Sequence, residues 1–192
     1  MTSCRKQEQQ KKNKEKKMYR RILVSALLVG ALPCQTMWAA DEGNPNIDYE
    51  AFAKGVVEVG RLRAARRISE ERFIEMAADP ETVVLDARSK EKFDLLHVKG
   101  AVHLSLPDMT EAELARVIPE KTTRVLIYCN NNFERAPVAF PTKRVGASLN
   151  VHTFNVLHQY GYRNVYELKP LLDIDKTKIP FAGSRAGQRD EM

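Results

Sequence analysis

Cysteine is scarce in this sequence, which holds three among its 192 residues. Cys4 and Cys34 fall in a segment that we expect to be removed, so the mature chain keeps only Cys129. One thiol cannot form an internal disulfide, and a domain of this size folds without one. A single cysteine in an exported protein is either buried and inert or kept for its reactivity, and the count leaves both open.

The sequence also lacks an apolar run long enough for a stable membrane anchor. Residues 22–32 are apolar, follow Arg20 and Arg21, and are shorter than the roughly 20 residues that span a bilayer. This pattern predicts an export signal over residues 1–40, with Met18 as a possible true start. We therefore expect a periplasmic or extracellular protein with no membrane contact after signal removal. An uncleaved single-pass anchor is the alternative.

The chain beyond residue 40 has no excess of basic residues. Residues 1–40 hold 9 Lys and Arg against 2 Asp and Glu, and residues 41–192 hold 22 against 23. The net charge of +6 therefore belongs to the predicted signal. A mature chain near neutrality, without clustered basic residues, argues against nucleic acid as a partner. The four histidines are not spaced as metal ligands, so we expect neither a metal nor a cofactor.

Short apolar segments alternate with helical patterns beyond residue 66. The pattern predicts strands over residues 83–85, 101–106, 125–128 and 165–168, and helices that begin after Ser69, Ser89, Thr110 and Ser148. Such alternation is typical of βαβ units. The predicted fold is therefore α/β, a doubly wound parallel sheet with helices on both faces.

The same patterns divide the chain into segments. Residues 41–66 form an N-terminal extension with a short helix near residues 49–57, and residues 67–174 form the domain. Residues 175–192 are expected to be a loose C-terminal tail. In doubly wound sheets, ligands bind beyond the carboxyl ends of the strands, and Cys129 lies at that end of the most apolar strand. This position favours the reactive interpretation of the thiol.

Four segments, in order, resemble the rhodanese family. Residues 83–89 read Val-Val-Leu-Asp-Ala-Arg-Ser, and residues 97–102 read His-Val-Lys-Gly-Ala-Val. Residues 125–129 then end in Tyr-Cys, and residues 161–166 read Gly-Tyr-Arg-Asn-Val-Tyr. The resemblance implies a parallel sheet of the rhodanese type and a cysteine that accepts a sulfane sulfur as a persulfide. Its partners would be a small sulfur-containing anion or persulfide donor, and a thiol or other nucleophilic acceptor.

The candidate site is the segment from Cys129 to Arg135. Cys129 is the expected nucleophile, and Arg135 the cation that would lower the thiol pKa and clamp an anion. The expected anion-binding loop between them comprises Asn130, Asn131, Asn132, Phe133 and Glu134. Asp86 and Arg88 are expected to brace the neighbouring loops by hydrogen bonds.

The loop also departs from the family pattern. It contains no glycine, its Cys-x5-Arg spacing resembles that of rhodanese-fold phosphatases and arsenate reductases, and about a dozen extra residues precede the next helix. Three hypotheses follow: an exported sulfurtransferase or persulfide carrier, a Cys-x5-Arg phosphatase or arsenate reductase, and a non-catalytic binding module. The module would meet a protein partner through residues 133–147.

Overall fold

The computed structural model describes residues 43–187. The predicted export signal and the start at Met18 therefore lie outside the described residues. Within residues 43–187, no helix is both long enough and apolar enough to cross a membrane.

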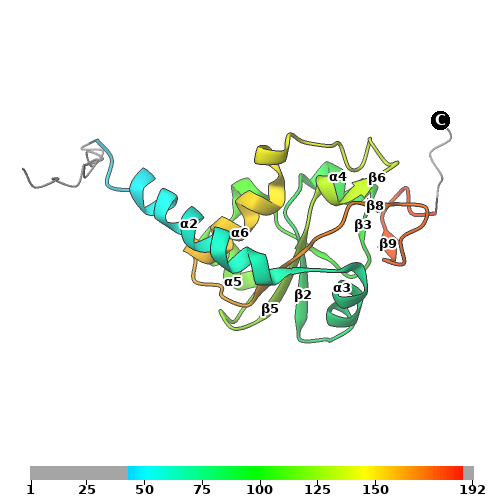
Figure 1. Ribbon diagram of the computed structural model, residues 1–192, viewed down its shortest axis with the longest axis horizontal. Helices are drawn as coiled ribbons and strands as arrows, with labels where there is room; N and C mark the ends of the chain where they lie inside the picture. The colour runs from blue at the N-terminus through cyan, green and yellow to red at the C-terminus, as the bar shows by residue number, and fades with distance from the viewer. Residues whose placement is uncertain (1–42, 188–192) are drawn as a thin grey trace, which may run out of the picture. The chain divides into compact units, whose positions relative to one another are not determined.

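The centre of the domain is a five-stranded sheet in which every strand pair is parallel (Figure 1). The strand order is β1-β7-β5-β2-β4. The strands are β1 (Arg67–Ile68), β2 (Thr82–Asp86), β4 (Val102–His103), β5 (Arg124–Tyr128) and β7 (Val165–Leu168). The longest strands, β2 and β5, lie side by side, with Val84 level with Leu126. The predicted α/β class and parallel sheet are confirmed.

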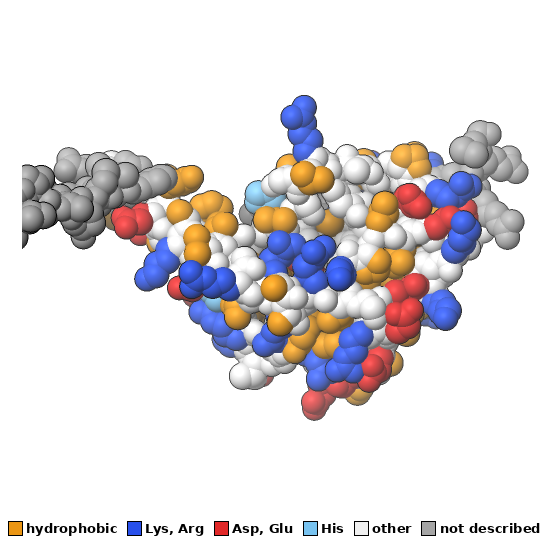
Figure 2. All heavy atoms as spheres, viewed as in Figure 1, with side chains coloured by type: hydrophobic (Ala, Val, Ile, Leu, Met, Phe, Trp, Pro, Cys, Tyr) orange, Lys and Arg blue, Asp and Glu red, His pale blue; other side chains and the backbone are white. Residues whose placement is uncertain are grey.

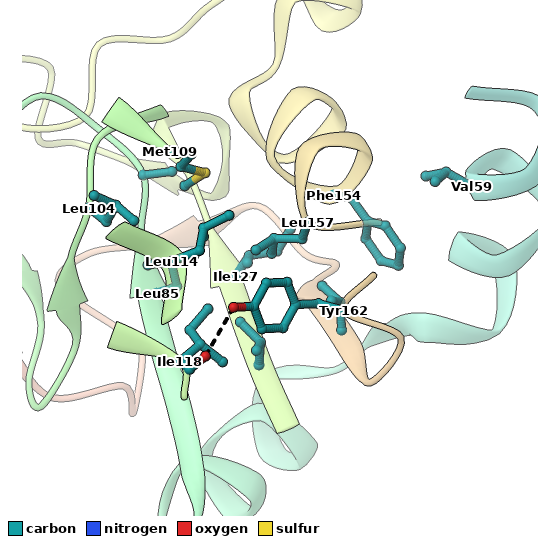
Figure 3. Close-up of a cluster of buried hydrophobic side chains, with 13 residues drawn as sticks. Val59, Leu85, Leu104, Met109, Leu114, Ile118, Ile127, Phe154, Leu157 and Tyr162 are labelled. Atoms are coloured by element: carbon teal, nitrogen blue, oxygen red, sulfur yellow. Dashed lines mark hydrogen bonds between the residues drawn. The ribbon is translucent and has the colours of Figure 1, made fainter. Parts of the chain in front are cut away.

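Side chains alternate between the two faces of the sheet along each strand. Both faces carry apolar side chains, and helices cover both. One face carries α2 (Tyr49–Arg66), α5 (Glu111–Val117) and α6 (Leu149–Gln159). Their apolar residues pack with the inward side chains of β2, β5 and β7, and Tyr162 closes this cluster by donating to the Ile118 carbonyl at 3.0 Å (Figure 3). The opposite face carries α3 (Glu70–Ala77), and α4 (Lys90–Leu95) leads into Leu96, which packs there.

Capping side chains set where α3 and α5 begin, whereas the Ser89 side chain makes no capping hydrogen bond to α4. Ser69 accepts a hydrogen bond from the Arg72 amide, and Thr110 accepts one from the Glu113 amide. The helix after Ser148 begins as predicted, but the Ser148 side chain makes no capping hydrogen bond. Its hydroxyl is directed to the candidate site instead.

Two sequence-based predictions of local structure are wrong in extent. The helix near residues 49–57 continues for 18 residues, to Arg66. The strand expected over residues 101–106 is limited to Val102–His103, and Leu106–Asp108 form a 3-10 turn, η1. Proline at position 107 explains the turn, because its fixed φ favours a helical start and its nitrogen cannot donate to a neighbouring strand.

The tail is also different from the prediction, since residues 175–187 fold back on the domain. β9 (Phe181–Ala182) pairs antiparallel with β3 (His97–Val98), and Ile179 is buried in the second core. Glu70 accepts hydrogen bonds from the Lys178 amide and the Thr177 hydroxyl, both at 2.5 Å. The polar composition of the tail concealed two large apolar side chains that complete this core.

We predict that Ile179→Ala lowers the free energy of unfolding by about 2–4 kcal/mol, because it leaves a cavity in the second core. Chemical denaturation of the full chain measures the loss. Leu171→Ala is the matched control, because this leucine is 61% exposed and its truncation is expected to cost less than about 0.5 kcal/mol. Equal, small losses for both variants would show that the tail does not pack on the domain.

Candidate functional site

Cys129 lies at the carboxyl end of β5, the central strand of the sheet. It precedes the 3-10 turn η2 (Asn130–Asn132), in which the Asn132 amide donates to the Cys129 carbonyl at 3.1 Å. The Cys129 sulfur lies 3.5 Å from the Ser148 hydroxyl. The residue is only 1% exposed. The thiol is therefore at the predicted place in the fold, but it is covered, with the Ser148 hydroxyl in contact with its sulfur.

Asn132 fastens the turn to two neighbouring elements. Its side-chain oxygen accepts from the Cys129 amide at 2.9 Å and from Asn150 of α6 at 3.0 Å. Its nitrogen donates to the carbonyls of Leu168, at 2.8 Å, and Pro170, at 3.1 Å. Every position on this side chain is used for bracing, which leaves it no free donor for an anion.

Asn131 joins the turn to the inserted segment, residues 135–147. Its side chain donates to the Lys143 carbonyl at 2.8 Å and accepts from the Lys143 amide at 3.0 Å. This paired contact holds the segment closed next to the turn. Asn130 is different, because it is 4% exposed and its side-chain oxygen has no hydrogen-bond partner among the described residues.

The last two residues of the predicted anion-binding loop, Phe133 and Glu134, form the short strand β6, which pairs with β8 (Leu172–Asp173). The Phe133 ring is buried, with its centroid 4.8 Å from that of Phe140 and 5.1 Å from that of Phe181. The Glu134 side chain is exposed. Neither residue lines a cavity with Cys129, because pairing with β8 directs one side chain to the core and the other to solvent.

Arg135 does not contact the sulfur, contrary to the prediction. It has a φ of 68°, the left-handed region, and its guanidinium lies 3.0 Å from Asp175 and 3.8 Å from Asp173. The hydrogen bond to Asp175 and the charges of both aspartates raise the pKa of Arg135. The left-handed turn after β6 directs the side chain outward, to Asp173 at the end of β8 and Asp175 just after it. A clamp made by Cys129 and Arg135 is therefore not formed in this structure.

Asp86 and Arg88 form a buried ion pair, 0% and 2% exposed, with a shortest N–O distance of 2.6 Å. Arg88 also donates to the Leu96 carbonyl at 2.6 Å and to the Ala139 carbonyl at 2.9 Å. Its guanidinium carbon lies 4.1 Å from the centre of the Phe140 ring. The pair thus ties the end of β2 to the end of α4 and to the inserted segment.

Tyr128 extends the brace to the residue before the thiol. Its hydroxyl donates to Asp86 at 2.5 Å and accepts from the Val98 amide at 3.0 Å. Burial and then the charge of Asp86 raise the pKa of Tyr128 well above its usual value, so it stays a neutral donor at physiological pH. The residue before Cys129 is consequently tied to the end of β2 and to Val98 of β3.

A pocket of about 580 Å³ opens beside the thiol, at the carboxyl ends of β2, β4 and β5. Asn130 and Leu149, the chain neighbours of Cys129 and Ser148, line it, as do the cationic residues Lys92 and Lys143. The other lining residues come from the turns after β2 and β4 and from the inserted segment: Ala87, Arg88, Ser89, Ser105, Leu106, Pro107, Pro141 and Thr142. Figure 2 shows one face of the molecule, with its Lys and Arg side chains in blue.

Two residues of the site were not identified from the sequence as site residues. Ser148 was expected only to cap a helix, and Asn150 gave no signal, because a lone asparagine within a helical pattern resembles any polar position. Of the residues predicted to bind an anion, only Asn130 lines the pocket.

Comparison with known proteins gives one family. A family model described as "Rhodanese-like domain" matches residues 69–169, which is more than half of the chain. No curated protein matches the chain.

Solved structures with a similar fold include three whose sequences are at most 20% identical to this chain. An Escherichia coli rhodanese with anions is 20% identical, covers 53% of this chain and 98% of its own, and gives a TM-score of 0.36. The rhodanese-like domain of the Anabaena sp. Alr3790 protein is 17% identical over 66% and 86%, with a TM-score of 0.48. The Saccharomyces cerevisiae single-domain sulfurtransferase RDL2 is 10% identical over 57% and 85%, with a TM-score of 0.39.

We predict that the Asn131–Lys143 contact controls access to the thiol. Asn131→Ala removes both hydrogen bonds, worth about 1.5 kcal/mol together, and should raise the alkylation rate of Cys129 about tenfold. Mass spectrometry of the peptide that contains Cys129 measures the rate separately from other thiols. Arg135→Ala is the control, because this side chain lies on the aspartates, and we expect less than about a twofold change. A larger effect of Arg135→Ala would place the guanidinium at the sulfur in solution.

Proposed function

The chain belongs to the rhodanese-like domain family, and from that premise we propose that it is an exported persulfide carrier. Cys129 accepts a sulfane sulfur from a small sulfur-containing anion or a persulfide donor and passes it to a thiol or other nucleophile. A periplasmic or extracellular location is part of the proposal, and it derives from the pattern of residues 1–40. The donor and acceptor reach the sulfur from the pocket beside Asn130.

The observation that carries the proposal is the position of the sulfur. The Ser148 hydroxyl lies 3.5 Å from Sγ at the carboxyl end of the central strand, beside a pocket with two lysines. Nearby cations attract an anionic donor. Lys92 and Lys143, which line the pocket, therefore take the anion-attracting role that the sequence had assigned to Arg135.

The transfer balances without an oxidant. With thiosulfate as donor, the Cys129 thiolate attacks the outer sulfur, the sulfur–sulfur bond of thiosulfate breaks, and sulfite leaves with the electron pair. The cysteine then carries a persulfide, a reversible modification. An acceptor thiolate attacks the outer sulfur of that persulfide, the Cys129 thiolate leaves, and the acceptor becomes the persulfide. The proton of the resting thiol passes to water.

The burial of Cys129 favours a carrier over a rapid sulfurtransferase. A thiol that is 1% exposed reacts only when the inserted segment or Ser148 moves. The same cover shields a bound sulfane sulfur from stray nucleophiles. Slow loading and a long-lived persulfide are therefore expected.

A non-catalytic binding module is the second candidate function. The low exposure of Cys129 and the outward position of Arg135 favour it. The segment predicted to meet a protein partner, residues 133–147, exposes Val138 and Val145, which are 45% and 89% accessible. The third hypothesis, a phosphatase or arsenate reductase, needs an arginine at the sulfur and has no such support.

We predict that incubation of the full chain with thiosulfate or a low-molecular-weight persulfide adds the mass of one sulfur atom to the Cys129 peptide. A reducing thiol should remove it, and Cys129→Ser should show no adduct at that peptide. Asn131→Ala, with its more accessible thiol, should load about tenfold faster. If Cys129 is alkylated readily in Asn131→Ala but accepts no sulfur from any donor, the carrier proposal is wrong and the binding module stands.

A further inference from the structure

The pocket beside Cys129 is larger than a small sulfur oxyanion needs. Its volume of about 580 Å³ lies within the roughly 300–1,000 Å³ of sites that hold drug-sized organic ligands. A thiosulfate ion would leave most of that space to water. Part of the wall is apolar, and it is supplied by Ala87, Leu106, Pro107, Pro141 and Leu149. The pocket therefore has both the room and the surface for an organic group attached to the transferred sulfur.

The charged groups of the pocket are cationic, and none of the described residues that line it is acidic. Arg88 is 2% exposed and paired with Asp86, so its charge is balanced within the core. Lys92 forms an ion pair with Glu91 at 2.8 Å. Lys143 is exposed, and its ammonium group forms no hydrogen bond or ion pair with another residue in 43–187. Lys143 therefore offers an unbalanced positive charge at the wall of the pocket.

Contacts of its backbone hold Lys143 in this place. Its amide and carbonyl form the paired hydrogen bonds with the Asn131 side chain, at 3.0 and 2.8 Å. Asn131 belongs to η2, the turn that follows Cys129. The Lys143 side chain takes no part in that contact, so it is able to bind a ligand while the backbone stays attached to the turn.

The carboxamide of Asn130 adds an unfilled hydrogen-bonding position. The residue is 4% exposed and lines the pocket, and its oxygen Oδ1 has no partner within the described part of the chain. Buried acceptors of this kind normally have a donor. Asn130 follows Cys129 directly, so a donor to Oδ1 would lie close to the sulfur. An amide N–H a few bonds away from a reacting sulfur would meet this requirement.

We propose that the pocket takes an organic persulfide of the size of a short peptide, which bears a carboxylate and an amide N–H, and that Lys143 determines this specificity. The carboxylate binds the ammonium group of Lys143, the N–H donates to Oδ1 of Asn130, and the organic body packs on the apolar wall. The inference rests on the proposed function, because it names the class of donor that loads Cys129.

The transfer from such a donor is balanced. The Cys129 thiolate attacks the outer, protonated sulfur of the persulfide, the sulfur–sulfur bond of the donor breaks, and the donor leaves as a thiolate with the electron pair. Cys129 then carries the sulfane sulfur and its proton as a persulfide. No oxidant is consumed. The carboxylate and the N–H of the donor are unchanged, so their contacts orient the donor without taking part in the chemistry.

Loading of Cys129 by two matched donors tests the specificity. The donors are the persulfides of N-acetylcysteine and of N-acetylcysteine amide, which differ in the carboxylate. We expect the carboxylate donor to load the full chain about fivefold faster, measured by mass spectrometry of the Cys129 peptide, and the two rates to converge in about 1 M salt. Lys143→Gln should remove the preference, and Lys143→Arg should keep it.

Lys99→Gln is the matched control. Lys99 is also exposed, and its side chain has no partner in residues 43–187, but it does not line the pocket. The preference for the carboxylate donor should persist in this variant. Equal loading of the wild-type chain by the two donors would overturn the inference, as would equal effects of Lys143→Gln and Lys99→Gln. Faster loading by thiosulfate than by either persulfide would assign the pocket to an inorganic anion instead.

Binding without transfer separates this inference from the proposed function. N-acetyl-S-methylcysteine and its amide have no sulfur to transfer, and titration of Cys129→Ser with each, followed by NMR, gives their affinities. We expect the carboxylate compound to bind about fivefold more tightly, and Lys143→Gln in the same chain to remove the difference. Such binding, with no sulfur adduct in the wild-type chain from any donor, would leave the pocket specificity standing and contradict the persulfide carrier. Loading of Cys129 with no preference for a carboxylate would do the reverse.

Discussion

The carboxamide of Asn132 is the hydrogen-bonding centre on which the geometry of the site depends. It connects the amide of Cys129, the side chain of Asn150 in α6, and the carbonyls of Leu168, the last residue of β7, and Pro170. A buried amide that lost these partners would leave several polar groups unsatisfied, at a cost of about 1–3 kcal/mol each. The turn after β5 is therefore fixed in one conformation, and with it the position of the sulfur. In this loop, asparagine provides rigidity in a place where the sequence suggested an anion-binding loop.

A second constraint acts from the other side of the strand. The buried pair of Asp86 and Arg88 contacts Tyr128, the end of α4 and the inserted segment. Removing one member would leave an unpaired buried charge, which typically costs about 3–5 kcal/mol. The two braces meet at Tyr128 and Cys129, so the thiol sits on a rigid base beneath a cover that depends on few contacts. A rigid backbone at Cys129, beneath an inserted segment that few contacts hold, suits a thiol that reactants reach only when that segment moves.

The sequence was sufficient for the architecture because the fold depends on patterns that can be read locally. Apolar runs at β2 and β5 and the capping side chains of Ser69 and Thr110 each act within a few residues. The position of Cys129 at the end of β5 followed from the same patterns. The direction of Arg135 did not, because it depends on a left-handed residue and on Asp173 and Asp175, about 40 positions later in the chain. The contact of Ser148 with Cys129 spans 19 positions, and Ile179 returns to a core built mainly by earlier residues, so no local pattern encodes either.

The central claim is that the covered sulfur of Cys129 carries a sulfane sulfur. A crystal structure of the chain after incubation with a persulfide donor tests it most directly. The account predicts electron density for one additional sulfur bonded to Sγ and directed toward Asn130, with the Ser148 hydroxyl displaced from its present distance of 3.5 Å. Density that ends at Sγ, with Ser148 and the inserted segment unchanged, would contradict it.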